Sequence, residues 1–214
     1  MTHKHIKVLL ADDHAVVRAG YKFLLENVRD IEVIAEAASG EEAIALFEQY
    51  QPDVLVLDLS MPGIGGLEAI RRLCVRQPEA RILVFSMHES PTLVEHALQA
   101  GVSGYISKNS SPEVLVNAVR RIAAGGLYVD AELAQNLVVQ QRRDKGLTLS
   151  GLSIRELQIL CMFAEARPID DIAATLSLSS KTIANYLSQI KDKLQVSSSA
   201  ELVRLAISKG LVSV

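Results

Sequence analysis

Tryptophan is absent from the 214 residues and other aromatic side chains are few, so any core must be mainly aliphatic. No stretch of about 18 or more uncharged apolar residues exists, which argues against a membrane-spanning helix. The first seven residues hold no apolar run, so we expect no secretory signal. Cys74 and Cys161 lie far apart and form no CxxC motif. We therefore expect two core thiols in a protein of the reducing cytoplasm.

A marked basic excess is also missing. The net charge is −3, with 15 basic and 19 acidic residues in 1–146 and 7 basic and 6 acidic residues in 147–214. Nucleic-acid-binding domains usually carry a clear basic excess, so the second half shows only a weak electrostatic sign of such a partner. The length suits one large domain or two small ones.

The first 125 residues alternate between short aliphatic runs and segments of 3.6-residue periodicity. The runs predict strands over 6–11, 31–36, 54–59, 82–86 and 104–107. The periodic segments predict helices over 15–27, 41–49, 67–76, 93–100 and 112–124. Strands that alternate with helices indicate a parallel sheet covered on both faces. We therefore predict an α/β flavodoxin-like, doubly wound, five-stranded parallel sheet.

The remaining chain is helical in pattern. A glycine pair at 125–126 ends the fifth helix, an amphipathic segment follows over 130–141, and residues 140–146 are polar without periodicity. Four further helices are predicted over 153–166, 169–176, 181–194 and 200–208. This pattern predicts an α/β domain over 1–125, a linker with an extra helix over 126–150, and a small all-α four-helix domain over 151–214.

Polar side chains stand where the predicted strands end. Asp12 and Asp13 follow the first strand, Asp58 lies at the end of the third, Ser86 ends the fourth and Lys108 follows the fifth. Ligands of open parallel sheets bind at this edge, so these side chains should converge. Each aspartate alone would more commonly be a helix cap or turn residue, but five such residues at successive strand ends favour a functional site.

The chemistry of such a site follows from its charges. Three neighbouring carboxylates repel one another unless a cation lies between them, and a hard ion such as Mg²⁺ suits oxygen ligands. A carboxylate can act as a nucleophile and form an aspartyl-phosphate. Lys108 would balance charge on the phosphoryl oxygens, and Ser86 would donate a hydrogen bond to one of them.

Residues 6–125 closely resemble the receiver domain of bacterial response regulators. The resemblance rests on LLADDH at 9–14, VLVLDLSMPG at 54–63 and GYISK at 104–108. It implies that Asp58 accepts a phosphoryl group from a partner sensor histidine kinase, which supplies the phosphohistidine. The chain would then be a phosphoacceptor with at most autodephosphorylation activity, rather than an enzyme.

The same resemblance implies roles for the neighbouring residues. Asp13 and Asp58 would bind Mg²⁺ directly, together with the backbone carbonyl of Ser60, while Asp12 would act through water. Ser86 and Tyr105 would form a switch pair, in which Ser86 moves toward the phosphate and Tyr105 turns inward. A tyrosine on the fifth strand could equally be a simple packing residue.

The C-terminal domain resembles the LuxR-type helix-turn-helix. The matching stretches are LSIRELQIL at 152–160, DIAATL at 171–176, SKTI at 180–183 and IKDKLQV at 190–196. A short turn between two helices is the geometry that places the second helix in a DNA major groove. The whole chain is thus similar to the NarL/FixJ family of transcriptional regulators, and GIGGLEA at 63–69 with Tyr186 resembles its GacA/UvrY branch.

The predicted recognition helix presents a polar face for DNA. Asn and Gln side chains can read adenine edges, whereas Ser and Lys can hold phosphates. The predicted DNA-binding residues are Lys181, Asn185, Ser188, Gln189, Lys191 and Lys193. This face could also be an ordinary solvated helix surface. Family members often carry basic residues at positions occupied here by Asp170, Ala184, Ser188 and Ser199, so much of the expected phosphate contact is missing.

Three functions fit these features. The first is a phosphorylation-gated regulator that binds DNA, with a phosphorylation-driven homodimer compensating for the depleted basic face. The second is a receiver whose helical domain binds a partner protein or dimerises without specific DNA binding. The third is a phosphoryl-transfer enzyme or phosphate sink with no output of its own, against which the intact four-helix domain argues.

Overall fold

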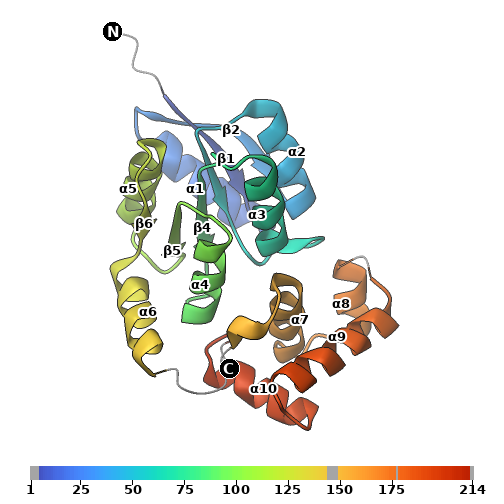
Figure 1. The fold of residues 1–214 in the computed structure, drawn as a ribbon. Helices are drawn as coiled ribbons and strands as arrows, with labels where there is room; N and C mark the ends of the chain where they lie inside the picture. Colours follow the sequence, from blue (N-terminus) through green and yellow to red (C-terminus); the bar gives the residue numbers. More distant parts are fainter. Residues whose placement is uncertain (1–4, 144–148, 177, 213–214) are drawn as a thin grey trace. The chain divides into compact units, whose positions relative to one another are not determined.

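A computed structural model describes residues 5–143, 149–176 and 178–212 of the chain (Figure 1). The chain divides into two compact units, which are described separately here. One consists of Met1–Met87 with Ala97–Asp130, and the other of His88–His96 with Ala131–Val214. In the described ranges, no helix combines the length and apolar character needed to cross a membrane.

A parallel sheet forms the centre of the first unit. Its strands are β1 (Ile6–Ala11), β2 (Ile31–Ala37), β3 (Val54–Leu57), β4 (Ile82–Ser86), β5 (Gly104–Ser107) and β6 (Tyr128–Val129). The order across the sheet is β2-β1-β3-β4-β5-β6, with every pair parallel. The parallel α/β class is confirmed, but the predicted count of five strands is wrong. A sixth, two-residue strand lies beyond residue 125, while the predicted domain boundaries at 125 and 150 stay predictions.

Five helices connect these strands: α1 (Ala15–Glu26), α2 (Gly40–Tyr50), α3 (Gly65–Arg76), α4 (Pro91–Gln99) and α5 (Pro112–Ala123). Two of their start signals act as expected. The Ser39 side chain caps α2 by accepting a hydrogen bond from the Glu42 amide at 3.2 Å. Pro112 occupies the first turn of α5, where a missing amide hydrogen costs nothing.

Alternating strand residues divide the aliphatic side chains between the two faces of the sheet. One face carries Val8, Leu10, Val54, Val56, Leu83, Phe85 and Ile106, which pack with Leu25 of α1 and the apolar side of α5. On the opposite face, Leu57 lies against α3, near Gly66. Figure 1 shows α1 and α5 on one side of the sheet, and α2 and α3 on the other. This layering leaves the carboxyl ends of the strands as an open polar edge.

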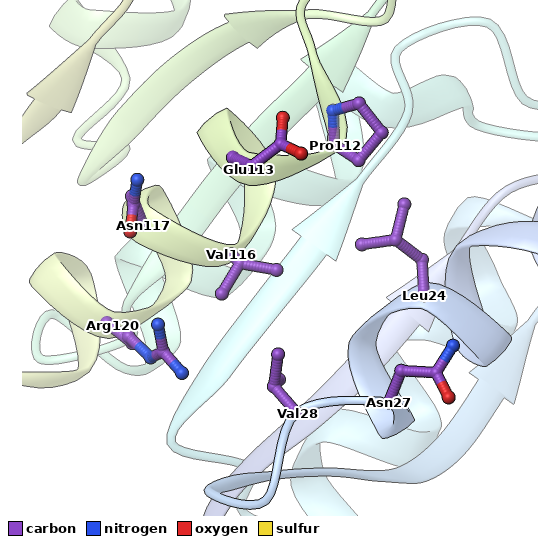
Figure 2. Close-up of a pocket in the computed structure, with 8 residues that line it drawn as sticks. All are labelled: Leu24, Asn27, Val28, Pro112, Glu113, Val116, Asn117 and Arg120. Carbon is purple, nitrogen blue, oxygen red and sulfur yellow. The ribbon is translucent and has the colours of Figure 1, made fainter.

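A shallow groove runs between α1 and α5 (Figure 2). Leu24, Val28 and Val116 form its apolar floor, and Arg120 lies at its rim. Arg120 donates two hydrogen bonds to the Asp30 carboxylate, at 2.8 and 2.6 Å, and so ties α5 to the start of β2. Asp12, Asp13, Asp58 and Lys108, which were predicted to converge at the ends of the strands, do not line this groove.

The second unit contains α6 (Ala131–Arg143), a short 3-10 turn (Leu149–Gly151), α7 (Ile154–Ala164), α8 (Ile169–Thr175), α9 (Ser180–Lys193) and α10 (Ser199–Ser208). The four predicted C-terminal helices are confirmed within one or two residues at each end. Helices α7, α8 and α9 contact one another, and α10 packs on α7. Part of the predicted linker, residues 144–148, lies outside the described residues.

Candidate functional site

The loops that follow β1 and β3 bring the predicted carboxylates together. The amide of Asp58 donates to the Ala11 carbonyl at 2.9 Å, and the amide of Asp12 donates to the Ala37 carbonyl at 3.0 Å. These bonds continue the pairing of the strands for one residue and thereby fix where each loop departs. Only 2% of Asp12 and 4% of Asp58 is exposed. Two buried carboxylates therefore face the same edge of the sheet.

Lys108 supplies the positive charge between them. Its Nζ lies 2.7 Å from Asp12 Oδ2 and 2.8 Å from Asp58 Oδ2, and its side chain is buried. Burial alone would lower the pKa of this amine, but the charges of Asp58 and Asp12 and their hydrogen bonds outweigh it. The pKa of Lys108 is consequently raised above its ordinary value, and the ammonium stays charged. We call Asp12, Asp13, Asp58 and Lys108 the acidic site.

Two carboxylate oxygens of the acidic site are left without a hydrogen bond. They are Oδ1 of Asp58 and Oδ1 of Asp13, both buried. A buried carboxylate oxygen without a donor is costly, and a bound cation is one partner that would satisfy it. Ligand atoms of Asp12, Asp13, His14 and Asp58 all lie within 4.8 Å of one another. The donor set and the two unpartnered oxygens thus fit a hard divalent cation.

Two residues absent from the predicted set lie at the edge of the acidic site. His14 Nδ1 lies 2.9 Å from Asp13 Oδ1, although the pair makes no hydrogen bond, and the imidazole is 65% exposed. Arg18, in the first turn of α1, donates to the backbone carbonyl of Asp12 at 2.5 Å. The only signal for either in the sequence is closeness to the Asp12-Asp13 pair.

The predicted switch residues lie on neighbouring strands. Ser86 ends β4 and Tyr105 lies on β5, where it is paired with Val84. Both side chains are fully buried. The Lys108 amide donates to the Ser86 carbonyl at 2.9 Å, so the backbones of the expected switch and of the charged lysine are joined directly. Ser60 lies in the exposed loop between β3 and α3, and the role of its carbonyl stays a prediction.

Close packing holds α3 against the end of β3. A Cβ placed on Gly66 would lie 2.3 Å from the carbonyl oxygen of Asp58 and 2.6 Å from the Cα of Leu59. Both neighbours are backbone atoms that cannot turn aside. A side chain at Gly66 would therefore displace the peptide that carries Asp58.

The second candidate site is the outward face of α9. Ser179 caps this helix by accepting from the Thr182 amide at 3.1 Å, and the buried side of the helix carries Ile183, Leu187 and Ile190. The predicted DNA-contacting side chains Lys181, Asn185, Ser188 and Gln189 are exposed, and Lys191 is half-buried. Lys193, the sixth predicted residue, is also 46% exposed, so all six lie where a ligand could reach them.

Lys193 has an internal partner. Its Nζ lies 2.7 Å from Oε2 of Glu156, a buried carboxylate that also accepts from the Ser153 amide at 2.7 Å. Ser153 and Glu156 form a reciprocal cap at the start of α7. Burial acts to raise the pKa of Glu156, but the bonds from Lys193 and Ser153 outweigh it and lower that pKa. The ammonium of Lys193 thus joins the end of α9 to the start of α7.

An acidic residue lies beside the start of α9. Asp170, in the first turn of α8, accepts a hydrogen bond from Ser180 Oγ at 2.5 Å. Ser180 is the first residue of α9. Asp170 therefore holds the head of α9 against α8, and it offers a negative charge there instead of a phosphate contact.

Two protein families match the chain. The family described as the response regulator receiver domain matches residues 8–120. The family described as bacterial regulatory proteins, luxR family, matches residues 150–206. Together these matches cover both the acidic site and the α9 face.

Curated relatives match over almost their whole length. The transcriptional activator protein ExaE of Pseudomonas putida is 44% identical over 211 residues, which cover 97% of this chain and 98% of that protein. The response regulator UvrY of Escherichia coli K12 is 37% identical over 208 residues, which cover 96% of this chain and 95% of that protein.

A solved structure shows the same fold. RcsB from Salmonella enterica serovar Typhimurium, bound to promoter P1flhDC in the presence of phosphomimetic BeF3−, matches with a TM-score of 0.71 and 26% identity. The match covers 99% of this chain and all of that one.

Proposed function

Because the chain belongs to the response regulators that join a receiver domain to a LuxR-type DNA-binding domain, we propose that Asp58 accepts a phosphoryl group from a sensor histidine kinase. The phosphoryl group would leave a histidine nitrogen of the kinase and bond to a carboxylate oxygen of Asp58. The observation that carries this proposal is the state of Asp58, which is buried with one oxygen held by Lys108 and the other unpartnered.

The acidic site is compatible with a divalent cation, and we take that cation to be Mg²⁺. Asp13, Asp58 and the Ser60 carbonyl would bind it directly, while Asp12 would act through water. Mg²⁺ supplies charge that offsets the oxygens of the incoming phosphoryl group. Lys108 adds a second positive charge from the other side of Asp58, at 2.8 Å. The chain is a regulator rather than a typical enzyme, and slow autodephosphorylation at this site is a further proposal.

Phosphorylation would be read by Ser86 and Tyr105. Ser86 is fully buried and its carbonyl accepts from the Lys108 amide, which supports a role close to the phosphate. Tyr105 is buried on the neighbouring strand, as an inward-turned switch tyrosine would be. We propose that the signal passes from a receiver domain over 1–125, through a linker with an extra helix over 126–150, to an output domain over 151–214. The location we propose is cytoplasmic, which the two free cysteines support.

The output domain is of the LuxR DNA-binding type, and α9 is its proposed recognition helix. The exposed Asn185 and Gln189 are suited to base edges, whereas Lys181 and Ser188 are suited to phosphates. Few basic residues lie on this face, so we propose that a phosphorylated homodimer binds DNA through two copies at once.

The acceptor assignment can be tested on the full chain. Incubation with a small phosphodonor and Mg²⁺ should add one phosphoryl group, measured by intact-protein mass spectrometry. Asp58→Asn should remove that mass shift, and so should chelation of Mg²⁺. An undiminished shift in Asp58→Asn would sink the assignment.

The dimer needs a separate measurement. Sedimentation velocity with and without the phosphodonor should show a shift from monomer toward dimer in the wild type, and none in Asp58→Asn. A monomer in both states would contradict the proposed homodimer while leaving the acceptor assignment intact.

A further inference from the structure

The peptide that joins Asp12 to Asp13 is held from outside the acidic site. Asp12 itself is fixed twice, since Oδ2 accepts from Lys108 at 2.7 Å and Oδ1 accepts from the His14 amide at 2.8 Å. Asp13 has weaker support, because its Oδ1 makes no hydrogen bond and its near neighbour is the exposed imidazole of His14, at 2.9 Å. The direction of the Asp13 side chain therefore depends on its backbone.

Arg18 supplies that backbone support. Its Nη1 donates to the Asp12 carbonyl oxygen at 2.5 Å, while its Nε donates to Glu36 Oε2 at 3.2 Å. The guanidinium is planar and its donors have fixed directions, so two bonds also fix its orientation. The Arg18 side chain is only 17% exposed, which keeps water from competing freely for the same carbonyl.

The anchor on the far side is rigid. Glu36 lies on β2, in register with Leu10 of β1, so it moves with the sheet. Lys22 holds the other carboxylate oxygen of Glu36 at 2.8 Å. The hydrogen bond from Lys22, with the nearby positive charges, keeps the pKa of Glu36 below its ordinary value. We call Arg18, Glu36 and Lys22 the Arg18 network.

We propose that Arg18 is a positioning residue for the metal site, acting through the Asp12 carbonyl. A peptide group is planar, so fixing the carbonyl of Asp12 also fixes the plane that leads to the Asp13 Cα. Asp13 then presents its unpartnered oxygen toward Asp58 before any cation binds. The inference rests on the proposed Mg²⁺-dependent function, and it adds a residue that does not itself touch the cation.

The sign of the effect separates positioning from charge. A guanidinium close to three carboxylates repels a cation, so removing its charge alone would strengthen Mg²⁺ binding. Removing a positioning bond instead leaves the Asp13 side chain less ordered before Mg²⁺ binds. Ordering it on binding costs free energy, which weakens Mg²⁺ binding. The two explanations therefore predict opposite changes in the Mg²⁺ dissociation constant.

The test is Mg²⁺ titration of the full chain by calorimetry, checked with Mn²⁺ by electron paramagnetic resonance. Arg18→Met should weaken Mg²⁺ binding roughly 5-fold, as expected for losing one positioning hydrogen bond of typical net strength. Lys22→Met is the matched control, because it removes a cation from the same Glu36 but leaves the Asp12 carbonyl untouched. It should change the affinity less than about 2-fold, as a solvent-exposed pair would.

A second readout separates positioning from general damage to the fold. The rate of phosphorylation by a small phosphodonor should fall in Arg18→Met at low Mg²⁺ and recover at saturating Mg²⁺. Arg18→Lys keeps the charge but loses the planar fork, so it should weaken Mg²⁺ binding as well. This variant decides the matter if Arg18→Met does not fold, as judged by near-ultraviolet circular dichroism.

Three results would overturn the inference. They are wild-type or tighter Mg²⁺ binding in Arg18→Met, an unchanged dissociation constant in Arg18→Lys, and equal losses in Arg18→Met and Lys22→Met. A wild-type chain that binds no Mg²⁺ would instead defeat the proposed metal site, and with it the premise of the inference.

Discussion

Lys193→Met should destabilise the C-terminal domain without changing how that domain binds DNA. In the wild type, Lys193 Nζ lies 2.7 Å from the buried carboxylate of Glu156. The substitution keeps most of the side chain's apolar stem but leaves Glu156 with the Ser153 amide as its remaining partner from that cap. We therefore expect Lys193 to stabilise the folded domain rather than to contact a DNA phosphate.

The size of the loss follows from the exposure of the two partners. Hydrogen bonds to charged groups contribute about 1.5–3 kcal/mol, whereas solvent-exposed ion pairs contribute about 0–1 kcal/mol. Glu156 is 4% exposed but Lys193 is 46% exposed, so the pair belongs between these limits. We expect the free energy of unfolding to fall by about 1–2 kcal/mol at neutral pH.

The loss should also depend on pH. Lys193 helps to lower the pKa of Glu156 in the folded state, below its ordinary value of 4.5. A carboxyl group with a lowered pKa adds stability that is complete above the unfolded pKa and disappears as the pH falls through the folded pKa. The difference between wild type and Lys193→Met should consequently shrink as the pH drops below 4.5.

Lys191→Met is the matched variant on the same helix. Among the described residues, the Lys191 side chain makes no ion pair, so its loss should cost little stability. If Lys191 instead contacts a phosphate, its loss should make the log–log salt slope of DNA binding shallower by about 0.9. With Lys181 and Lys191 as the available lysines, the wild-type slope should be near −2 per half-site, by the rule of about −0.9 per phosphate.

Urea unfolding at several pH values measures the first effect, and fluorescence anisotropy with duplex DNA over a range of salt measures the second. Unchanged stability together with a shallower salt slope in Lys193→Met would refute the reasoning, since it would place the ammonium on DNA. A wild-type log–log salt slope near −3 per half-site would also indicate that a third lysine contacts a DNA phosphate.

Lys108→Ala should slow phosphorylation by a small phosphodonor while the circular dichroism spectrum stays native, because the ammonium supplies charge beside Asp58; an unfolded receiver would show that the side chain is structural. Gly66→Ala should lower the free energy of unfolding by about 1–3 kcal/mol in urea, because its Cβ would meet backbone. Gly20→Ala, with open space around its Cβ, is the control and should not destabilise the chain. Asn185→Ala should cost about 1–3 kcal/mol on the preferred DNA site only, and an equal loss on every duplex would argue against a base contact.

The fold and the acidic site were predictable because both depend on patterns close in sequence. Aliphatic runs of four to six residues identified five strands, and polar residues at their ends identified Asp12, Asp58 and Lys108. The sixth strand has only two residues, which is too short for a period to show. The predicted third strand was two residues too long, because Leu59 extends the aliphatic run past Asp58 although β3 itself ends at Leu57.

The remaining features depend on tertiary contacts that no local pattern contains. The third helix was predicted to begin at residue 67, but Gly65 and Gly66 already belong to it. Gly66 is a glycine because its packing against Asp58 leaves no room for a side chain, and this tertiary contact cannot be read from the local sequence. Lys193 and Glu156 are separated by 37 residues, and Arg18 reaches a carboxylate 18 residues away. Each of these basic residues looks in the sequence like a solvated position on an amphipathic helix.

The short strand β6 has a mechanical consequence for the receiver. The residue after it, Asp130, donates its amide to the Tyr105 carbonyl at 3.1 Å, and its carboxylate accepts from Ser110 Oγ at 2.5 Å. One bond reaches the strand of the proposed switch tyrosine, and the other reaches the loop that begins with Lys108. Asp130 is also the last residue before α6. Asp130 therefore connects both β5 and that loop, each through a single hydrogen bond, to the point where the chain leaves the sheet.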